Sequence, residues 1–388
     1  MKSKKKILFV FGTRPEGIKM APVVSEIDKY PDLFEKSIVV TGQHRQMLDQ
    51  VMEIFKIKAD HDLNIMEKNQ TLTGIVVKSL QGLEKIILSE KPDIILVQGD
   101  TSTAFAAGLI AYYHKIPVGH VEAGLRTFDK FNPFPEEINR KLLTSIAELH
   151  FAPTLSSFEN LIEEKVPREN IYLTGNTVID ALLEVVNKPY DLKKAGIDLP
   201  AGKKLILVTT HRRENFGPPL ENICRAIKRL AEKYANEVHF ILPVHKNPIV
   251  SKIVNEVLSD IKNITLLEPL DYETFIHIMD VSYLILTDSG GVQEEAPSLG
   301  KPVLVMREKT ERPDAVAAGT VKLVGMDEEK IFNEASKLIS DQNEYNKMSR
   351  AVNPYGDGKA AKRIFGGIMH YFKLQSMRPE EFNVKAGN

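Results

Sequence analysis

Short apolar runs alternate along the chain with longer segments whose apolar positions recur at helical spacing. Runs of this length predict buried strands, and the segments between them predict amphipathic helices. Near-continuous apolar strands separated by helices are typical of parallel sheets that are covered on both faces. The strands predicted in this way are residues 5–11, 36–41, 93–98, 118–121, 171–173, 203–208, 238–243, 264–267, 284–286 and 302–306, and the clearest helices are 72–89, 138–147, 249–258 and 360–372.

The pattern repeats once along the chain. The run 203–208 resembles the opening KKKILFVF, and THRRENFG then occupies the place that FGTRPEG holds in the first half. We therefore expect an α/β fold of two Rossmann-like, doubly wound domains that face a central cleft. A segment rich in Pro, Gly and Lys, 187–202, has the composition of a linker. The predicted domains are residues 1–173 and 174–355, and 356–388 supplies a helix that crosses back to the first domain.

Composition narrows the classes of function. With 388 residues, 43% of them hydrophobic, the chain is long enough for two well-buried cores. Its 51 Lys and Arg nearly balance its 52 Asp and Glu, so no net field attracts nucleic acid or an acidic membrane. The basic start MKSKKK precedes no signal-peptide core, and no apolar run approaches the ~20 residues that span a bilayer. These features predict a cytoplasmic protein that binds neither nucleic acid nor membrane.

Metal chemistry has little support in the sequence. Cys224 is the single cysteine, which excludes an internal disulfide, and no Cys/His cluster has the spacing of a zinc site. Asp60-His61-Asp62 matches the DxD spacing by which some glycosyltransferases hold a metal, but it lies in a polar connection rather than at a strand end. We interpret it as a solvated loop and expect no metal site.

The strand 284–286 leads into a turn with the properties of an anion site. Ser289, Gly290 and Gly291 open a helix there, whose first N–H groups are unpaired and whose dipole is positive at this end. The glycines let an anion such as phosphate approach the backbone closely. Glu295, further along the helix, is placed to accept hydrogen bonds from ribose hydroxyls. The alternative is an ordinary strand–helix turn in which Ser289 only caps the helix.

Cations accompany this turn and a similar turn in the first half. Arg307 and Arg312 follow the strand 302–306. In the first half, Arg14 and Lys19 flank the start of the helix that follows the first strand. That helix start is a second candidate for anion binding. The alternative is that Arg14 and Lys19 are surface cations on an ordinary helix.

Three acids stand at successive strand-to-helix connections of the first half. Asp100 follows strand 93–98, Glu122 follows strand 118–121, and Glu136 opens the next helix after a loop that contains prolines. In open parallel sheets, ligand-binding groups project from the C-terminal ends of the strands. Each acid alone also fits a helix cap or a surface charge. Their repetition at three connections favours a carboxylate cluster.

His211 follows the first strand of the second half, beside Arg212 and Arg213. We expect it to enter the cleft with cations that help to hold a diphosphate; the alternative is an exposed loop histidine. His245, at the end of another strand, is a weaker candidate.

Neither GxxxxGK[ST] nor a strand-linked GxGxxG is present, so the P-loop and the dinucleotide fingerprint are both absent. With the acids, these groups indicate a nucleotide-sugar enzyme.

With these residues assembled, the chain closely resembles the non-hydrolysing UDP-N-acetylglucosamine 2-epimerases. The motifs that carry the resemblance follow one another over nearly the whole chain, from about residue 7 to residue 372, as FGTRPEGIKMAP, TGQHRQMLDQ, QGDTST, GHVEAGLRT, FPEEINR, LTGNTVIDAL, THRREN, PVHKNP, LTDSGGVQEEAPSLGKPVLVMREKTERPDA and NPYGDG. The resemblance implies a fold like that of the glycosyltransferase-B group. It also implies interconversion of UDP-N-acetylglucosamine and UDP-N-acetylmannosamine for surface polysaccharide synthesis, a homodimer, and no redox cofactor.

The family's functional positions carry over to this chain residue by residue. The residues at its catalytic positions are Asp100, Glu122, Glu136 and His211, and those at its UDP-binding positions are Arg14, Lys19, Phe275, Ser289, Gly290, Gly291, Glu295 and Arg312. Leu270 also occupies a nucleotide-contact position, where some relatives have glutamine. Only its main chain can supply a polar contact there.

Many bacterial members of this family also bind UDP-N-acetylglucosamine as an activator in an adjoining site. Gln43 and Gln46 match the pattern of that site, and His245 is a further candidate for it. Asn69 stands where the pattern leads us to expect an arginine. Activation by substrate is therefore left open for this chain.

The chemistry implied by the family agrees with the candidate residues. The hydrogen on sugar carbon 2 is not beside a carbonyl, so a carboxylate cannot remove it directly, and transient oxidation would need a nicotinamide site. The family's route is elimination of UDP to 2-acetamidoglucal, followed by re-addition. We expect Asp100, Glu122 and Glu136 to share the acid and base roles, and His211 and the Ser289 turn to stabilise the departing diphosphate. A hydrolysing relative, a glycosyltransferase of the same fold and a non-catalytic nucleotide-sugar sensor remain the alternatives.

Overall fold

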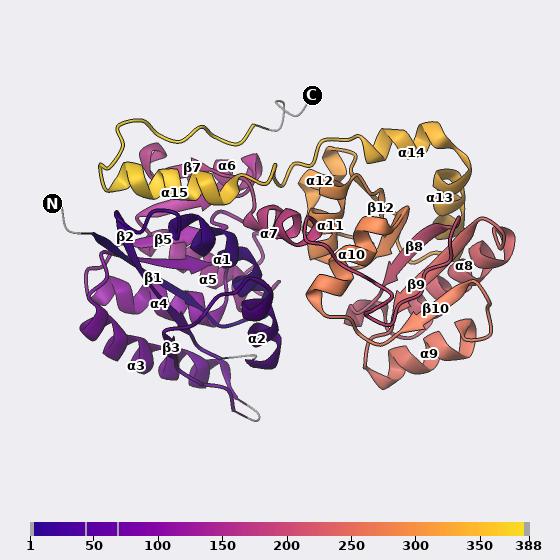
Figure 1. Ribbon diagram of the computed structural model, residues 1–388, viewed down its shortest axis with the longest axis horizontal. Coiled ribbons are helices and arrows are strands. Elements are labelled where there is room, and N and C mark those ends of the chain that lie inside the picture. The colour runs from indigo at the N-terminus through magenta and orange to yellow at the C-terminus, as the bar shows by residue number, and fades with distance from the viewer. Residues whose placement is uncertain (1–3, 43–44, 68–69, 384–388) are drawn as a thin grey trace. The chain divides into compact units, whose positions relative to one another are not determined.

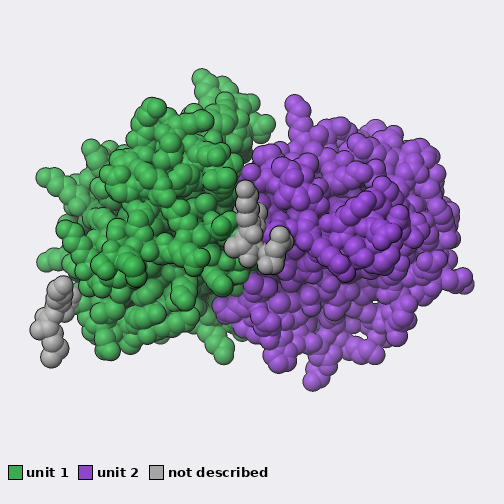
Figure 2. All heavy atoms as spheres, turned by 90° about the horizontal axis from the view of Figure 1, so that it is seen from above, with its two compact units in different colours: residues 1–181, 355–383 green, residues 182–354, 384–388 purple. Residues whose placement is uncertain are grey.

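The computed structural model describes residues 4–42, 45–67 and 70–383, which form two compact units (Figure 2). Unit 1 consists of Met1–Ala181 and Tyr355–Asn383, and unit 2 contains Leu182–Pro354. Each unit holds one sheet whose recorded strand pairs are all parallel. This arrangement confirms the α/β class that the alternation of strands and helices predicted. The domain boundaries expected from the sequence, after residues 173 and 355, stay a prediction.

Unit 1 contains the first sheet. Its strands, among the described residues, run in the order β3-β2-β1-β4-β5-β6-β7. They are β1 (Lys5–Phe11), β2 (Phe34–Val40), β3 (His61–Asp62), β4 (Ile94–Gln98), β5 (Val118–Val121), β6 (Leu149–Ala152) and β7 (Ile171–Leu173). The helices of this part of the chain are α1 (Arg14–Ile27), α2 (Arg45–Ile54), α3 (Leu72–Glu90), α4 (Ser102–Tyr113), α5 (Glu136–Ile146), α6 (Leu155–Glu163), α7 (Thr177–Val186) and α15 (Ala360–Tyr371).

Both faces of this sheet are covered, which explains the continuous apolar run of β1. Ile7, Phe9 and Phe11 belong to a buried cluster with residues of α1, α2 and α15. Leu8 and Val10 face the opposite way, into a cluster with residues of α3, α4 and α5. All five side chains are fully buried. A strand buried on both faces needs apolar residues at every position rather than at alternate ones.

Unit 2 contains the second sheet, whose strands run in the order β10-β9-β8-β11-β12-β13. Figure 1 labels β8, β9, β10 and β12 of this sheet. Its strands are β8 (Lys204–Thr209), β9 (Val238–Pro243), β10 (Ile264–Leu267), β11 (Leu284–Thr287), β12 (Val303–Val305) and β13 (Val321–Leu323). Its helices are α8 (Pro218–Lys233), α9 (Pro248–Leu258), α10 (Tyr272–Val281), α11 (Gly290–Glu295), α12 (Pro313–Ala317), α13 (Glu328–Ser340) and α14 (Gln342–Ser349). Buried residues of α8, α9 and α13 share one apolar cluster with the strands.

Each sheet has one point where the strand order reverses. In unit 1 the chain proceeds from β1 to β2 and β3 on one side and then places β4 on the other side of β1. In unit 2, β8 and β11 are related in the same way. Ligands of open α/β sheets bind outside the carboxyl ends of the strands at such a reversal. The segments that follow β1, β4, β8 and β11 are therefore where this fold leads us to expect functional side chains.

The chain passes from unit 1 to unit 2 within helix α7, between Ala181 and Leu182. The segment 187–202, which the sequence suggests as a linker, instead packs against unit 2. The ring of Tyr190 stacks on His277 at a centroid distance of 4.5 Å, and its hydroxyl lies 2.5 Å from Thr274 Oγ1. Ile197 of the same segment is also buried, so two side chains anchor this largely polar stretch.

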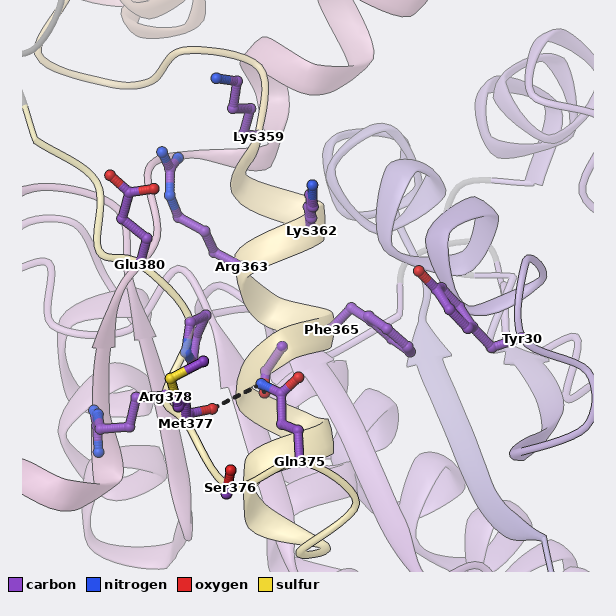
Figure 3. A pocket seen from close by; sticks show the side chains of 12 residues that line it. Tyr30, Lys359, Lys362, Arg363, Phe365, Gln375, Ser376, Met377, Arg378 and Glu380 are labelled. Atoms are coloured by element: carbon purple, nitrogen blue, oxygen red, sulfur yellow. Dashed lines mark hydrogen bonds between the residues drawn. The ribbon is translucent and has the colours of Figure 1, made fainter.

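The chain returns to unit 1 after Pro354, where α15 packs along α1. The rings of Tyr30 and Phe365 stack at 4.2 Å in this contact. The segment after α15 folds back over the helix, and Gln375 Nε2 donates to Gly366 O at 2.9 Å and to Met377 O at 3.0 Å (Figure 3). A cavity of about 490 Å³ lies between these elements. None of the described helices combines the length and the apolar character that crossing a bilayer requires.

Candidate active site

Glu122 lies directly after β5, and Lys19, Asn176 and Gln98 hold its carboxylate. Lys19 Nζ lies 2.5 Å from Oε1, and Asn176 Nδ2 donates to the same oxygen at 2.9 Å. Gln98 Nε2 donates to Oε2. The residue is only 8% exposed. One cation and two amides therefore fix the orientation of a nearly buried carboxylate. The sequence did not predict the contact between Lys19 and Glu122.

The backbone at this strand end is unusual. Glu122 has a φ of 65°, a left-handed conformation that costs a non-glycine residue about 1–2 kcal/mol. Gly99, with a φ of 68°, lies so close that a Cβ on it would come within 3.5 Å of Glu122 Oε2. Strain of this kind is retained where the surrounding structure holds the residue in a functional position.

Asp100 follows β4, the neighbour of β5, and is paired with an arginine. Arg140 Nε and Nη2 lie 2.7 Å and 2.6 Å from Asp100 Oδ2. Asn139 Nδ2 donates to the main-chain oxygen of Asp100 at 2.8 Å. Both partners come from the first turns of α5. The sequence did not single out Arg140, although it lies one helical turn after Glu136 in the same motif.

The adjacent acids Glu136 and Glu137 have different environments. Glu137 is fully buried and accepts hydrogen bonds from the main-chain N–H groups of Thr127 and Phe128, at 3.0 Å and 3.1 Å. Glu136, the first residue of α5, is half-buried, and its carboxylate forms no hydrogen bond or ion pair with the residues that the structure describes. Glu137 therefore stabilises the loop before α5, whereas the carboxylate of Glu136 is available to a ligand.

Glu16 is a structural carboxylate of this site that the sequence did not indicate. It accepts hydrogen bonds from Gly12 N at 3.0 Å, from Thr13 N at 2.8 Å and from Thr13 Oγ1 at 2.7 Å. Thr101 Oγ1 donates to its other oxygen at 2.6 Å. Burial raises the pKa of Glu16, although these hydrogen bonds act in the opposite direction. Glu16 joins the turn after β1, which carries Arg14, to the turn after β4, which carries Asp100.

Two histidines lie side by side on the neighbouring strands β5 and β6. His120 on β5 pairs in register with His150 on β6, and both are buried. His120 Nε2 lies 2.7 Å from the carbonyl oxygen of Gly99. Loss of hydration lowers the pKa of His120 to about 4 and that of His150 to about 3. Both rings are neutral at pH 7, and because a carbonyl only accepts, His120 carries its proton on Nε2.

These histidines predict that the protein loses stability in mild acid. Their ordinary pKa is 6.5, so below that pH the unfolded chain binds protons that the folded chain does not, until the folded values near 4 and 3 are reached. Each buried ring therefore lowers the free energy of unfolding at pH 5 by about 2 kcal/mol relative to pH 7. We expect His150→Gln to reduce the difference in unfolding free energy between pH 7 and pH 5 by about that amount, measured by urea denaturation. The same replacement at exposed His245 should leave the difference unchanged; an equal pH dependence in both variants would contradict the assignment.

In unit 2, His211 follows β8 and is oriented by Asp288, which follows β11. His211 Nδ1 lies 2.9 Å from Asp288 Oδ1. Asp288 Oδ2 also accepts hydrogen bonds from the main-chain N–H groups of His211 and Arg212 and from Asn215 Nδ2, each at 2.9 Å. Burial by itself would raise the pKa of Asp288, but the hydrogen bonds and charge of His211 and the main-chain donors lower it overall. A buried carboxylate thus fixes the ring of a histidine that is 42% exposed.

The Ser289 turn begins α11 as the sequence predicted, but Ser289 does not serve as the cap. It occupies the N-cap position, and its side chain accepts no capping hydrogen bond. A Cβ on Gly290 would lie 3.7 Å from Nη2 of Arg212 and 3.7 Å from Nη2 of Arg312. Two guanidinium groups therefore converge on the start of α11, where the helix dipole is also positive. Such a group of donors favours an anion with several oxygens, such as a diphosphate.

Glu295 closes the other side of this turn. It is 7% exposed, and Tyr272 Oη donates to its Oε1 at 3.2 Å. Phe275 lies one turn after Tyr272 on α10 and is half-buried, and half-buried Leu270 lies in the segment that leads to that helix. A buried carboxylate beside aromatic rings suits hydroxyl groups next to a planar base.

Comparison with known proteins identifies the family. A family model described as UDP-N-acetylglucosamine 2-epimerase matches residues 25–369. The UDP-N-acetylglucosamine 2-epimerase of Salmonella typhimurium is 53% identical over 373 residues, which cover 94% of this chain and 99% of the relative. The chain belongs to the UDP-N-acetylglucosamine 2-epimerase family. The resemblance that the sequence motifs indicated is thereby confirmed.

Solved structures extend this relationship. The crystal structure of the UDP-GlcNAc 2-epimerase from Neisseria meningitidis bound to UDP-GlcNAc is 48% identical, covers 94% of this chain and 99% of its own, and has a TM-score of 0.83. A glycotransferase of kitacinnamycin matches with a TM-score of 0.62 at only 10% identity, a likeness in fold alone. The predicted glycosyltransferase-B-like fold of this epimerase family member is therefore confirmed.

The predicted activator set of this family member is only partly described. Gln43 and Asn69 lie outside the described residues, and Gln46 lies on α2. His245 is exposed after β9, and its Nδ1 accepts a hydrogen bond from Asn247 N at 3.1 Å. It lines a cavity of about 540 Å³ whose other polar groups are Lys246, Ser251, Asn255 and Glu268. His245 and His211 follow neighbouring strands, β9 and β8.

The Asp60-His61-Asp62 segment of the epimerase family member is engaged in separate contacts. Asp60 accepts a hydrogen bond from Ile38 N at 2.8 Å, His61 Nε2 lies 2.7 Å from Glu90 Oε1, and Asp62 accepts from Asn64 N at 2.9 Å. Within 4–42, 45–67 and 70–383, no three His, Cys, Asp or Glu side chains are grouped closely enough to hold a metal.

Arg312 is the residue whose replacement should most clearly weaken nucleotide binding in this family member. Its Nε donates to buried Glu294, so Arg312→Lys retains a cation for that carboxylate but loses the planar pair of donors at Gly290. We expect UDP affinity to fall about tenfold or more, measured by calorimetry with UDP alone. Arg225→Lys, at an exposed ion pair with Glu328 in the same unit, is the matched control. Equal UDP affinity in both variants would exclude Arg312 from the nucleotide site.

Proposed function

We propose that the protein interconverts UDP-N-acetylglucosamine and UDP-N-acetylmannosamine by eliminating and re-adding UDP through 2-acetamidoglucal. The observation that carries the proposal is the pair of held acids, Asp100 and Glu122, at the ends of neighbouring strands β4 and β5. A protein that only bound the neutral sugar would need no such carboxylates. Membership of the 2-epimerase family supports the substrate, because one relative is crystallised with UDP-GlcNAc.

The reaction needs a base and an acid on opposite faces of carbon 2. In the forward step, the C2–H bond breaks and its proton passes to a carboxylate, while the C1–O bond breaks and its electron pair leaves with UDP. The double bond that forms between carbons 1 and 2 is then protonated at carbon 2 from the other face, and the UDP oxygen returns to carbon 1. No redox cofactor takes part in this sequence, and the net change is inversion at carbon 2.

The carboxylates are suited to share these roles. The lysine and the amide donors around Glu122 stabilise its ionised form, as a base requires. Arg140 pairs with the Asp100 carboxylate and fixes its orientation. The Glu136 carboxylate has no hydrogen-bond or ion-pair partner among the described residues, so a bound sugar can approach it directly. We assign the proton transfers to these three residues jointly.

Residues of unit 2 are proposed to bind the nucleotide. His211, held by Asp288, and the arginines at Gly290 would stabilise the charge that develops on the departing diphosphate. Glu295 and Phe275 would contact the ribose and the base, with the main chain of Leu270 as a further contact. Arg14 and Lys19 of unit 1 would contribute positive charge at the first helix, whose start is fixed by the Glu16 capping box.

Incubation with UDP-N-acetylglucosamine as the sole substrate in D₂O tests the proposal. NMR should show deuterium at carbon 2 in both epimers and no free N-acetylmannosamine. Free sugar together with UDP would instead indicate a hydrolysing 2-epimerase. A UDP-sugar that acquires no deuterium would contradict an epimerase and favour a glycosyltransferase or a sensor. Cytoplasmic location and a homodimer, both implied by the sequence and its resemblance, are part of the same proposal.

A further inference from the structure

Asn176, which no step of the proposed reaction uses, lies between helix α7 and Glu122. Its side-chain oxygen accepts a hydrogen bond from Val178 N at 3.0 Å, and its side-chain nitrogen donates to Glu122 Oε1 at 2.9 Å. The residue is 3% exposed. Because the helix holds the amide oxygen, the amide presents only its N–H group to the carboxylate. This contact therefore has a defined direction.

The main chain of Asn176 is bound to the second segment that connects the two units. Asn176 N donates to Tyr355 O at 2.6 Å. A Cβ on Gly175 would lie 3.4 Å from the Cα of Gly356, and a Cβ on Gly356 would lie 3.1 Å from Cγ1 of Ile179. The two connecting segments thus lie in contact, and Gly175 has a φ of 85°, a conformation that L side chains rarely adopt.

Further contacts hold the same junction together. Asp180 accepts hydrogen bonds from Ala360 N at 3.1 Å and Ala361 N at 2.9 Å, at the start of α15. Arg363 on α15 donates to Thr174 O at 3.1 Å, just before the first connection. The start of α7 and the start of α15 therefore form one hydrogen-bonded structure. Asn176 is the member of that structure that reaches Glu122.

We propose that Asn176 is a positioning residue for Glu122 that links the orientation of this carboxylate to the two segments by which the chain passes between its units. The inference rests on the proposed function, because it takes Glu122 to exchange a proton with sugar carbon 2. A shift of either connecting segment moves the Asn176 amide relative to Glu122 Oε1. The carboxylate then loses this donor, and its basicity and orientation change together.

Two replacements separate this role from a merely structural one. Asn176→Ser keeps an oxygen that can cap α7 but is too short to reach Glu122. Asn176→Asp keeps the shape and the capping oxygen but turns the donor into a second carboxylate oxygen beside Glu122. Asn187→Asp is the matched control, because Asn187 follows the same helix, is exposed, and its side chain donates to Leu183 O at 2.7 Å within that helix rather than to an acid of the site.

The measurements are kcat, UDP affinity and the pH dependence of deuterium incorporation at carbon 2. We expect Asn176→Ser to lower kcat roughly ten- to hundredfold with UDP affinity changed less than about twofold. In Asn176→Asp, repulsion between adjacent carboxylates should move one limb of the pH profile upward by about one pH unit or more. Movement of the acid limb would mark Glu122 as the base, and movement of the alkaline limb would mark it as the acid.

The outcomes distinguish the inference from the function on which it rests. If the unmodified enzyme incorporates no deuterium, the proposed function and the inference both fall. If it does, and both Asn176 variants keep its kcat and pH profile, the inference alone is overturned. Loss of thermal stability with an unchanged pH profile and an unchanged kcat at a permissive temperature would equally overturn it, because it would show a role in folding only.

Discussion

The Glu122→Gln protein should bind UDP but fail to exchange the hydrogen on sugar carbon 2. A glutamine has nearly the same shape, and its oxygen can still accept from Lys19 and Asn176, whose donors both face Oε1. Its amide nitrogen would face Gln98, which can rotate its own amide to present an oxygen. The variant should therefore fold, yet an amide cannot remove a proton. We expect kcat to fall about 10²–10⁴-fold, with UDP affinity within about tenfold.

The measurement is deuterium incorporation at carbon 2 beside UDP calorimetry. Glu159→Gln, an exposed change on α6 of the same unit, serves as the control and should retain full activity. Exchange at the normal rate in Glu122→Gln would remove this residue from the mechanism. The roles of Asp100 and Glu136 would then have to account for both faces of the sugar.

The second large effect is expected for Asp288→Asn. Three donors converge on Oδ2 of Asp288, so the asparagine should place its oxygen there and its amide nitrogen against His211 Nδ1. The amide nitrogen of the asparagine can only donate, so His211 Nδ1 has to accept, and the proton of the neutral ring moves to Nε2. The ring would keep its position and present the wrong tautomer. By the size of such effects in other His–Asp pairs, kcat should fall about 10²–10⁴-fold.

The Asp288→Asn variant also separates the effect of the orientation of His211 from the effect of the positive charge of the arginines. UDP affinity should change much less than kcat, because the arginines at Gly290 remain in place. Asp260→Asn, at an exposed position of the same unit, is the control. A large loss of UDP affinity with an unaffected kcat would contradict the assignment of His211 to the departing diphosphate.

The contacts that hold the candidate site residues join segments that lie far apart in the sequence. Arg140 is 40 residues from Asp100, and Asn176 is 54 residues from Glu122. Asp288 is 77 residues from His211, and Thr101 is 85 residues from Glu16. Local periodicity carries no information about such pairs. For that reason the sequence indicated Asp100, Glu122 and His211 but not the residues that hold them. It indicated neither Glu16 nor Thr101.

The acids of α5 show the same limit at short range. Glu136 and Glu137 are adjacent, equally polar and equally suited to the first turn of a helix. Only the path of the preceding loop, whose N–H groups at Thr127 and Phe128 point at Glu137, assigns one to structure. The resemblance to the epimerases selected Glu136 for catalysis, and its lack of a partner among the described residues is consistent with that choice.

The sequence by itself determined the α/β class with two parallel sheets and the family, and it indicated the strand ends at which we propose the functional groups. It could do so because burial on both faces of a parallel sheet demands continuous apolar runs, and because the residues after those runs are local to them. The tertiary structure decided which donors hold each carboxylate, that the chain passes between its units within α7 rather than in segment 187–202, and that Asn176 joins this passage to Glu122. Those features depend on packing between distant segments, which no local pattern of residue types encodes.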